Sequence, residues 1–466
     1  MQPVTFALYF GNRGFFPETL IAAARQQMQD RLEALGYGTL LMDAAATRYG
    51  AVESAEEGRR YAQFLDENRG RYDGVILCLP NFGDETGAVA ALQNARTPIL
   101  IHAYPDDLDR MGFSQRRDAF CGKMSIMDVF CQYGVPFTAL KPHVVDPASD
   151  AFARNVATFA ATCRVVSGVR NMIVGAIGAR TTAFKTIRFD ELALQRAGVT
   201  VETYDLSSVM GRTRRMDDGD LRAAAKLDRL RAYTNCGNVP AENMLTMAKL
   251  GVVIDDLIES ERLDAIALRC WLELEQELKI APCTLMSELN ERGIASACEG
   301  DVCNAVAMFA LSAASERPAA CLDWNNNYGE DDDRCILFHC GPVPQSLMTG
   351  KGEVIDHPMF AKELGPGCGF GPNTGRIAPT PMTYASMKTQ EGKVCFYVGE
   401  GEITDDPIAS DFFGVAGVAR IPGLQDKLQT IGYGGYRHHV SMTPGRVADG
   451  VKEALTRYLN YELTEL

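Results

Sequence analysis

Hydrophobic and polar positions along the chain fall into blocks that predict parallel strands followed by helices. An apolar run over residues 4–10 precedes a helical pattern over residues 17–35. The segments 72–80 and 98–103 are continuous apolar runs bounded by Gly or Pro, which is typical of strands buried on both faces. This alternation predicts an α/β domain over residues 1–150.

A second block of the same kind follows, and then the texture of the chain changes. Residues 171–178 form a buried-type strand, and residues 263–271 form a later one after several helical patterns. Towards the C-terminus, short strands alternate with Gly- and Pro-rich loops. We therefore predict a central α/β domain over residues 151–315 and a β-rich domain with a terminal helix over residues 316–466. The expected fold class is two doubly wound α/β domains followed by this β-rich C-terminal domain.

Composition and charge exclude several classes of function. The 466 residues include 60 Asp and Glu against 46 Lys and Arg, so the formal charge is −14, which argues against nucleic acid as a partner. No stretch approaches the roughly 18 apolar residues of a membrane span, and the first residues form a strand pattern without a basic leader. We expect a cytoplasmic protein whose 14 cysteines are mostly buried and reduced.

Two glycine-containing turns raise the alternative of a nucleotide enzyme. Gly11-Asn12-Arg13-Gly14 and Gly175-Ala176-Ile177-Gly178 each follow a strand, but neither has the G-x-G-x-x-G spacing that admits a dinucleotide pyrophosphate. The chain also has no G-x-x-x-x-G-K-[ST] loop. A dinucleotide-dependent oxidoreductase is therefore disfavoured, and ordinary strand-to-helix turns explain both segments.

The strongest chemical signal is a set of carboxylates and imidazoles beside apolar runs. Glu299 and Asp323 stand next to apolar or small residues, where an unpaired carboxylate is costly to bury. His339 ends an apolar strand, and His438 and His439 follow a Gly-Gly turn. Together these residues suit Mn²⁺ or another divalent cation better than structural zinc. Taken singly, each has a simpler explanation such as a helix cap or an ion pair, and spacing does not prove that they meet.

The other three of the six histidines are expected to be structural. His102 ends a strand, and His143 and His357 stand beside prolines. The candidate histidines are therefore the three named above.

Several short motifs, most of them between residues 270 and 341, form a recognisable set. They are Cys270-Trp271, Pro282-Cys283, Ser287, Gly293, Ala297-Cys298-Glu299-Gly300-Asp301, Leu322-Asp323-Trp324-Asn325, Phe338-His339-Cys340 and Gly434-Gly435-Tyr436-Arg437-His438-His439. This set resembles the L-fucose/L-arabinose isomerase family, and the order of domains extends the likeness more weakly over nearly the whole chain. The resemblance implies an Mn²⁺-dependent aldose–ketose isomerisation in a trimer-based homo-oligomer.

Carried over position by position, the resemblance implies roles for individual residues. Glu299 matches the first metal-binding and acid/base carboxylate, and Asp323 matches the second, where an aspartate resembles the fucose branch. His439 matches the C-terminal metal ligand, and His339 matches a ligand of the arabinose branch. Two carboxylates and a divalent cation suit this reaction, because moving a carbonyl between C1 and C2 requires two proton transfers and a stabilised enediolate.

Substrate contacts are expected from loops at strand ends. Arg13, Phe82 and Lys123 lie on or beside such loops of the first domain, which in the family that this chain resembles closes the active site of a neighbouring subunit. The further candidates for substrate binding are Arg180, Trp324, Asn325, Arg437 and His438.

A set of cations leaves two classes of sugar substrate open. The set is Arg13, Lys123, Arg180, Lys185, Arg376 and Arg437. If two or more converge, the pocket suits a sulfonated or phosphorylated hexose. If they only form surface ion pairs, a neutral sugar such as L-fucose, D-arabinose or L-arabinose is expected. A non-catalytic sugar-binding protein on the same scaffold is the remaining alternative.

Overall fold

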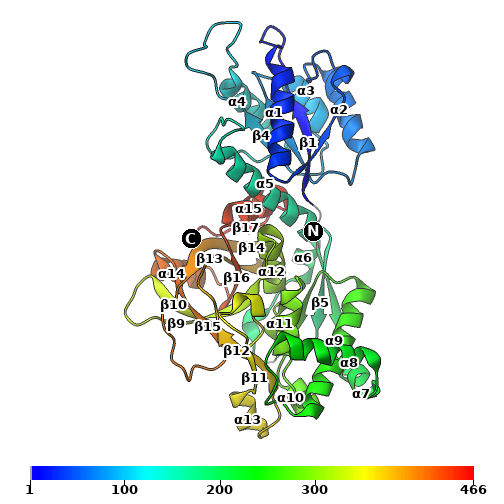
Figure 1. The fold of residues 1–466 in the computed structure, drawn as a ribbon, viewed down its shortest axis with the longest axis vertical. Helices are drawn as coiled ribbons and strands as arrows, with labels where there is room; N and C mark the ends of the chain where they lie inside the picture. Colours follow the sequence, from blue (N-terminus) through cyan, green and yellow to red (C-terminus); the bar gives the residue numbers. More distant parts are fainter. Residues whose placement is uncertain (1–2, 182) are drawn as a thin grey trace. The chain divides into compact units, whose positions relative to one another are not determined.

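The computed structural model describes residues 3–181 and 183–466, which divide into two compact units. Unit 1 is formed by residues 1–167 and 452–460, and unit 2 by residues 168–451 and 461–466. The predicted fold class is confirmed, because two parallel sheets covered by helices precede a large mixed sheet (Figure 1).

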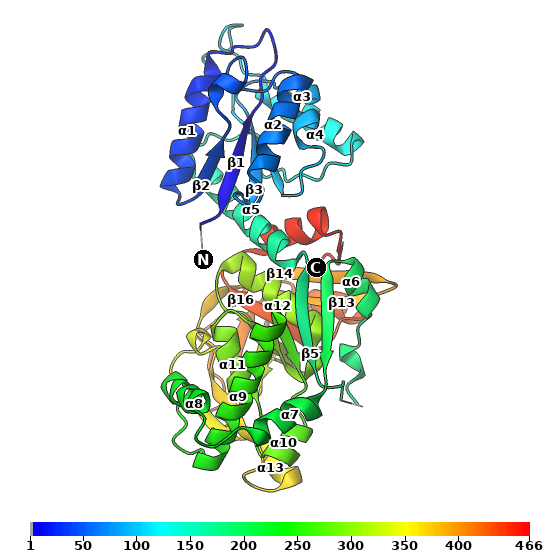
Figure 2. The same ribbon diagram turned by 90° about the vertical axis from the view of Figure 1, so that its right-hand side faces the viewer.

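Unit 1 is a parallel sheet of order β2-β1-β3-β4 with helices on both faces. Its elements are β1 (Thr5–Phe10), α1 (Leu20–Ala34), β2 (Gly38–Leu41), α2 (Ala55–Glu67), β3 (Gly74–Leu79), α3 (Glu85–Leu92), β4 (Ile99–Ala103), α4 (Ala119–Gln132) and α5 (Asp150–Val169). Figure 2 shows α1 on one face of the sheet and α2 and α3 on the other. Phe6 and Leu8 of β1 enter one core and Ala7 and Tyr9 enter the other. Both faces are therefore apolar, which explains the uninterrupted hydrophobic runs.

The segment 452–460 belongs to unit 1 although it lies near the end of the chain. The Tyr458 hydroxyl accepts a hydrogen bond from the Ile99 amide at 3.2 Å and lies 3.0 Å from Thr138 Oγ1. The expected terminal helix is α15 (Ala448–Glu453), which continues into a wider helical turn over Ala454–Tyr458.

Unit 2 begins with a second parallel sheet, of order β6-β5-β7-β8. Its elements are β5 (Met172–Ile177), α6 (Glu191–Arg196), β6 (Val199–Tyr204), α7 (Leu206–Arg215), α8 (Leu221–Tyr233), α9 (Ala241–Glu261), β7 (Ala265–Leu268), α10 (Glu273–Leu278), α11 (Cys283–Glu291), β8 (Ala295–Ala297) and α12 (Val302–Ser315). The continuous apolar run of β7 is buried at every position, as its pattern predicts.

A nine-stranded mixed sheet forms the rest of unit 2, in the order β11-β12-β15-β10-β9-β16-β13-β14-β17. Its elements are β9 (Ala320–Asn327), β10 (Arg334–His339), β11 (Glu353–Asp356), α13 (Pro358–Leu364), β12 (Phe370–Arg376), β13 (Thr380–Gln390), β14 (Lys393–Ile403), β15 (Val415–Arg420), α14 (Leu424–Tyr433), β16 (His439–Pro444) and β17 (Glu462–Leu463). The neighbours β10, β9 and β16 are antiparallel to one another.

Helix α12 joins the two sheets of unit 2. It packs against β5, β7 and β8 of the parallel sheet and against β9, β13 and β16 of the mixed sheet. A helix buried on both sides must be apolar all round, and the small side chains of this helix let both sheets approach closely. α12 begins at Val302, three residues after Glu299.

Two expectations about the chain as a whole are met by the described residues. Among them, no helix has both the length and the apolar character that crossing a membrane requires. All fourteen cysteines are free thiols, and most of them are buried.

His102 of β4 is an uncharged residue of the unit 1 core. Its ring packs edge-on against Tyr104 and Phe152, and its Nε2 has no hydrogen-bond partner among the described residues. Burial, with a smaller contribution from the charge of Lys123, lowers the pKa of His102 to about 3. In the unfolded chain the His102 imidazole binds a proton as the pH falls below about 6.5, whereas in the folded chain it stays neutral down to about pH 3. The free energy of unfolding therefore decreases as the pH falls below about 6.5.

We predict that His102→Leu makes the stability of unit 1 less dependent on pH. Between pH 7 and pH 5 the wild-type protein should lose about 2 kcal/mol through this group, whereas the variant has no imidazole to protonate. Hydrogen exchange of the β3 and β4 amides at the two pH values measures the difference. An equal loss in both proteins would contradict the assignment.

Candidate active site

Three elements of unit 2 bring Glu299, Asp323 and His439 together. Glu299 lies in the turn between β8 and α12, Asp323 lies on β9, and His439 begins β16. Asp323 stands directly opposite His439 in the register of these neighbouring strands. His439 Nε2 is 3.0 Å from Glu299 Oε2 and 3.6 Å from Asp323 Oδ1. The imidazole therefore lies against both carboxylates that the sequence singles out.

The backbone of Glu299 adopts an unusual conformation. Its φ of 61° and ψ of 12° place it in the left-handed region, which costs a residue with a side chain roughly 1–2 kcal/mol. The side chain is fixed at both oxygens, because Trp271 Nε1 donates a hydrogen bond to Oε1 at 3.2 Å and His439 meets Oε2. The strain therefore aims the carboxylate at the site.

Asp301, a motif residue to which the sequence alone assigns no role, orients His439 from behind. Its Oδ2 lies 2.9 Å from His439 Nδ1, and its Oδ1 is paired with the Arg437 guanidinium. Oδ1 also accepts the Asn304 amide at 3.1 Å and so caps α12. Asp301, Arg437 and His439 are all buried. A carboxylate behind a histidine in this way fixes the ring and its tautomer.

The charges of the site are strongly coupled. Burial alone would lower the pKa of His439, but Asp301 and Glu299 raise it to about 10. Burial opposes ionisation of Glu299, yet the hydrogen bond and charge of His439 hold its pKa below the usual value. Burial also opposes ionisation of Asp301, yet Arg437 and His439 hold its pKa well below the usual range. The carboxylates of Glu299 and Asp301 are thus ionised, and their negative charges favour a positive charge on the His439 ring.

The residues present fit a divalent cation. Asp323 Oδ1 and His339 Nε2 are buried and have no hydrogen-bond partner among the described residues. Glu299, His438 and His439 each offer a ligand atom, and these three atoms lie within 4.8 Å of one another. Carboxylate oxygens with imidazole nitrogens are ligands that suit divalent first-row metals. His339 is close by, with its ring centroid 5.9 Å from that of His439.

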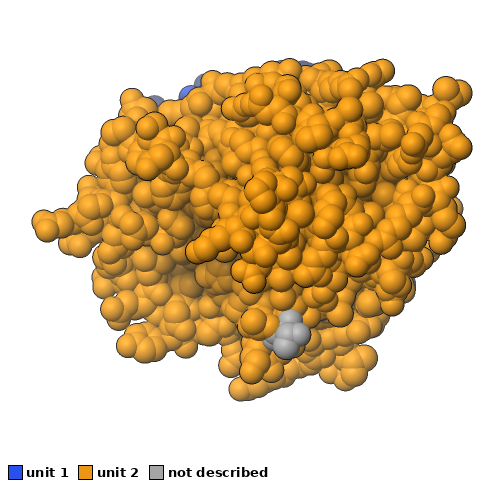
Figure 3. Space-filling model, turned by 90° about the horizontal axis from the view of Figure 1, so that it is seen from below, with its two compact units in different colours: residues 1–167, 452–460 blue, residues 168–451, 461–466 orange. Residues whose placement is uncertain are grey.

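A cavity of about 400 Å³ adjoins these residues. Glu299, Asp323 and His339 line it, together with thiols and with apolar side chains such as Phe338. Figure 3 shows one face of unit 2, whose surface is hollowed. Among the described residues, the lining contains no lysine or arginine. It does contain Glu275, which is fully buried and whose pKa burial raises to about 9, so this carboxyl is uncharged.

A loop after β5 places two of the candidate cations beside the site. The Phe184 ring packs edge-on against His438 and Trp271, with centroids 5.4 Å and 5.8 Å away. Thr181 Oγ1 donates a hydrogen bond to the Trp271 carbonyl at 3.2 Å. Arg180 and Lys185, on the same loop, are exposed.

The other candidates of unit 2 have different surroundings. Trp324 Nε1 donates to the Tyr397 hydroxyl at 3.2 Å, which turns its ring into the core of the mixed sheet, and Asn325 is exposed on β9. Arg437 lies behind His439 as described. Arg376 donates its hydrogen bonds to backbone carbonyls.

Arg13, Phe82 and Lys123 lie in unit 1. The Arg13 guanidinium is 4.4 Å from the Phe82 ring centroid and pairs with Glu85. Lys123 is buried, donates a hydrogen bond to the His143 carbonyl at 2.8 Å, and has a pKa that burial lowers to about 8. These contacts fix both cations within unit 1.

Comparison with known proteins places both ends of the chain in one family. Residues 7–170 match the N-terminal domain of fucose/sulfoquinovose isomerases, and residues 337–466 match the C-terminal domain of L-fucose isomerase. Similar curated proteins include the sulfoquinovose isomerases of Priestia aryabhattai and Priestia megaterium, each 24% identical over 410 residues, which cover 86% of this chain and 87% of the relative. The sulfoquinovose isomerase of Alkalicoccus urumqiensis is 23% identical over 412 residues, which cover 86% of this chain and 88% of the relative.

These matches agree with the geometry of the site. The motifs around Glu299, Asp323 and His439 lie on the three elements that meet at His439, and the matched segments come from both units. The chain belongs to the L-fucose isomerase family.

Proposed function

We propose that this protein is a divalent-metal-dependent aldose–ketose isomerase that acts on a sulfonated hexose. The observation that carries the isomerase assignment is the contact of His439 Nε2 with both Glu299 and Asp323 at the edge of a cavity. The same arrangement argues against a purely sugar-binding role, because binding alone does not require an ionised glutamate held against an imidazole with a second carboxylate beside it.

Proton transfer is assigned to the two carboxylates. Asp323 Oδ1 has no hydrogen-bond partner among the described residues, so it is free to take up a proton from a sugar carbon or hydroxyl. Glu299 is ionised and is oriented by Trp271, so it serves as the second proton carrier, beside the same His439 nitrogen. Both groups line the same cavity, which meets the need of the reaction for two positioned acid/base groups.

The cation-binding residues are proposed to be Glu299, Asp323 and His439, with His339 as the nearest further imidazole. A bound Mn²⁺, or another divalent cation, supplies Lewis acidity that stabilises the enediolate. Asp301 and Arg437 act through His439, so we assign Arg437 a positioning role in place of contact with the substrate. His438, with its ring against Phe184, stays a candidate for substrate binding.

The substrate class follows from the relatives and from the cation-bearing loop. The similar proteins are sulfoquinovose isomerases, which are named for a sulfonated hexose. Because the cavity lining itself has no lysine or arginine among the described residues, the sulfonate requires cations at the rim. Arg180 and Lys185 meet this need, since Thr181 and Phe184 attach their loop to Trp271 in the cavity wall.

Two related proposals complete this assignment. A neutral sugar of the L-fucose or D-arabinose type is the second candidate substrate. It is favoured by the cavity lining, which among the described residues contains carboxyl groups but no lysine or arginine. We also propose that the protein is a homo-oligomer in which Arg13, Phe82 and Lys123 contribute to a neighbouring subunit's site, as the family resemblance implies.

We predict that Glu299→Gln and Asp323→Asn each lower kcat/KM by roughly 10³-fold or more, because each removes an acid/base group and a negative charge. Ketose formation measured on purified protein with added Mn²⁺ tests this. The matched control is Glu330→Gln, on an exposed loop, which should retain wild-type turnover. Near-wild-type activity in either site variant would refute the assignment.

We predict that Asp301→Asn weakens Mn²⁺ binding by about 10-fold to 100-fold, although asparagine keeps the cap of α12, because the charge that orients His439 is lost. Calorimetric titration with Mn²⁺ measures the affinity. Asp220→Asn, which alters the cap of α8 in the same way, is the control.

His439→Ala should lower the Mn²⁺ affinity more than His438→Ala does, because only His439 contacts both carboxylates. Equal losses of Mn²⁺ affinity in the two variants would contradict the choice of His439 over His438 as the cation ligand.

We predict that Arg180→Ala and Lys185→Ala raise KM for a 6-sulfonated hexose and leave KM for L-fucose unchanged, since only the sulfonate needs their charge. Parallel measurements of kcat/KM for the sulfonated hexose, a hexose 6-phosphate, L-fucose and L-arabinose test this, with Arg215→Ala on α7 as the control. If the neutral sugars are preferred by every variant, the second candidate substrate replaces the first.

A further inference from the structure

Four cysteines form a chain of thiols in unit 2, and the reaction proposed above does not use them. Cys298 Sγ donates to Cys270 Sγ at 3.2 Å, and the Cys283 and Cys340 Sγ atoms are 3.7 Å apart. The Sγ atoms of Cys298 and Cys340 lie within 4.8 Å of each other, which links the two pairs. The four residues follow or begin four separate elements, so the tertiary fold brings these thiols together.

The thiol chain is reached from the cavity at Cys340. Cys270, Cys283 and Cys340 line the cavity, and of the four cysteines only Cys340 is not fully buried. A space of about 400 Å³ admits a molecule as small as a peroxide. Cys340 is therefore the thiol that meets an oxidant first, and Cys283 is the neighbour that lines the same wall.

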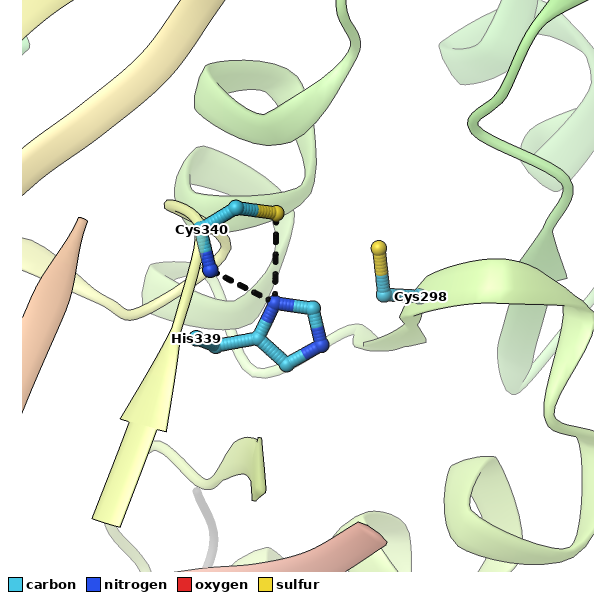
Figure 4. A group of neighbouring side chains, drawn as sticks. All are labelled: Cys298, His339 and Cys340. Atoms are coloured by element: carbon cyan, nitrogen blue, oxygen red, sulfur yellow. Dashed lines mark hydrogen bonds between the residues drawn. The ribbon is translucent and has the colours of Figure 1, made fainter. Parts of the chain in front are cut away.

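Cys340 is also tied to the site through His339. Figure 4 shows the His339 ring beside Cys340, with Nδ1 3.3 Å from Cys340 Sγ and accepting the Cys340 amide at 2.9 Å. Any displacement of Cys340 must therefore move this imidazole. His339 Nε2 is the buried nitrogen without a partner among the described residues.

The pairwise spacing of the thiols favours disulfide chemistry over a cation bound by sulfur. A four-sulfur shell needs all four Sγ atoms around one point, whereas here the sulfurs follow one another in a chain whose shortest contacts are Cys298 to Cys270 and Cys340 to Cys283. Cys298, His339 and Cys340 do offer three ligand atoms within 4.8 Å, so a thiophilic cation such as Zn²⁺ is the competing occupant.

We propose that Cys340 and Cys283 form a reversible disulfide when the protein meets a peroxide, and that this bond weakens divalent-cation binding by displacing His339. The cysteine pairing is independent of the proposed function, and only the effect on the cation rests on it. Cys340 sulfur attacks the peroxide oxygen, which breaks the O–O bond and gives a sulfenic acid and one water. Cys283 sulfur then attacks the sulfenic sulfur, forming the S–S bond and releasing a second water. The two thiols lose two electrons, and the peroxide is reduced.

The geometry indicates which residue moves when the bond forms. The two Sγ atoms must close from 3.7 Å to about 2.0 Å. Cys283 begins α11, a helix buried along most of its length. Cys340 lies beyond the end of β10 and is only half-buried, so it moves towards α11 and carries His339 with it.

The test treats the 466-residue, Mn²⁺-loaded chain with a few equivalents of hydrogen peroxide in the absence of reductant. We expect two of the 14 thiols to be lost, peptide mapping to show a Cys283–Cys340 linkage, and Mn²⁺ affinity to fall by about 10-fold. Dithiothreitol should restore both the thiols and the affinity. Cys121→Ser, an exposed thiol of α4, is the matched control and should behave as the wild type.

After peroxide treatment, the Cys283→Ser variant should show no disulfide at Cys340. It should also show no loss of Mn²⁺ affinity of the kind that dithiothreitol reverses. A linkage between Cys270 and Cys298 instead, oxidation that dithiothreitol does not reverse, or unchanged Mn²⁺ affinity after the linkage forms would overturn the proposal. Zn²⁺ binding would also overturn the proposal. In that case the untreated protein would take up Zn²⁺, the bound Zn²⁺ would prevent the linkage, and Cys298→Ser would abolish the uptake. Because the linkage and the Mn²⁺ titration need no sugar, a failure to isomerise any sugar would count against the proposed function alone.

Discussion

The buried carboxylate of Asp301 is the interaction on which the site and its surroundings depend. It caps α12, pairs with Arg437 and fixes His439, so one side chain connects the helix between the two sheets with the strand that carries the imidazole. Each of these partners is buried, and removing one member of such a network typically costs roughly 3–5 kcal/mol. The local fold and the charge of the site are therefore fixed by the same group.

This dependence explains why a site of ionised carboxylates is compatible with a buried position. Arg437 offsets the charge of Asp301, and Asp301 in turn favours the protonated form of His439, which lies against Glu299. The positive charge needed beside Glu299 and Asp323 is thus relayed from an arginine that touches neither. A divalent cation at the same place would replace the proton of His439 and leave the remaining network unchanged.

The sequence predicts the parallel sheets well because their strands are buried on both faces and leave uninterrupted apolar runs, as in β3 and β7. The mixed sheet is predicted only as β-rich, since its order depends on pairings such as β12 with β15, which no local pattern encodes. Glu299 and His439 were found through motifs, because 140 residues separate them and spacing gives no distance. Asp301 was missed although its signal was present: it precedes an apolar helix and Asn304, as a helix cap does. Arg437 is expected at the substrate because it stands beside His438 in the sequence. In an extended chain, however, residues two positions apart point to the same side, so Arg437 and His439 both face Asp301.

The left-handed backbone of Glu299 sets stability against the catalytic role proposed for this residue. Glycine or asparagine would relieve the strain, so a library selected only for resistance to heat would be enriched in those two replacements and would lose the carboxylate. With the role proposed for Glu299, a glutamate would persist there only while turnover itself is under selection. Drift at this codon is thus a sensitive record of whether a lineage still uses the enzyme or retains only its scaffold.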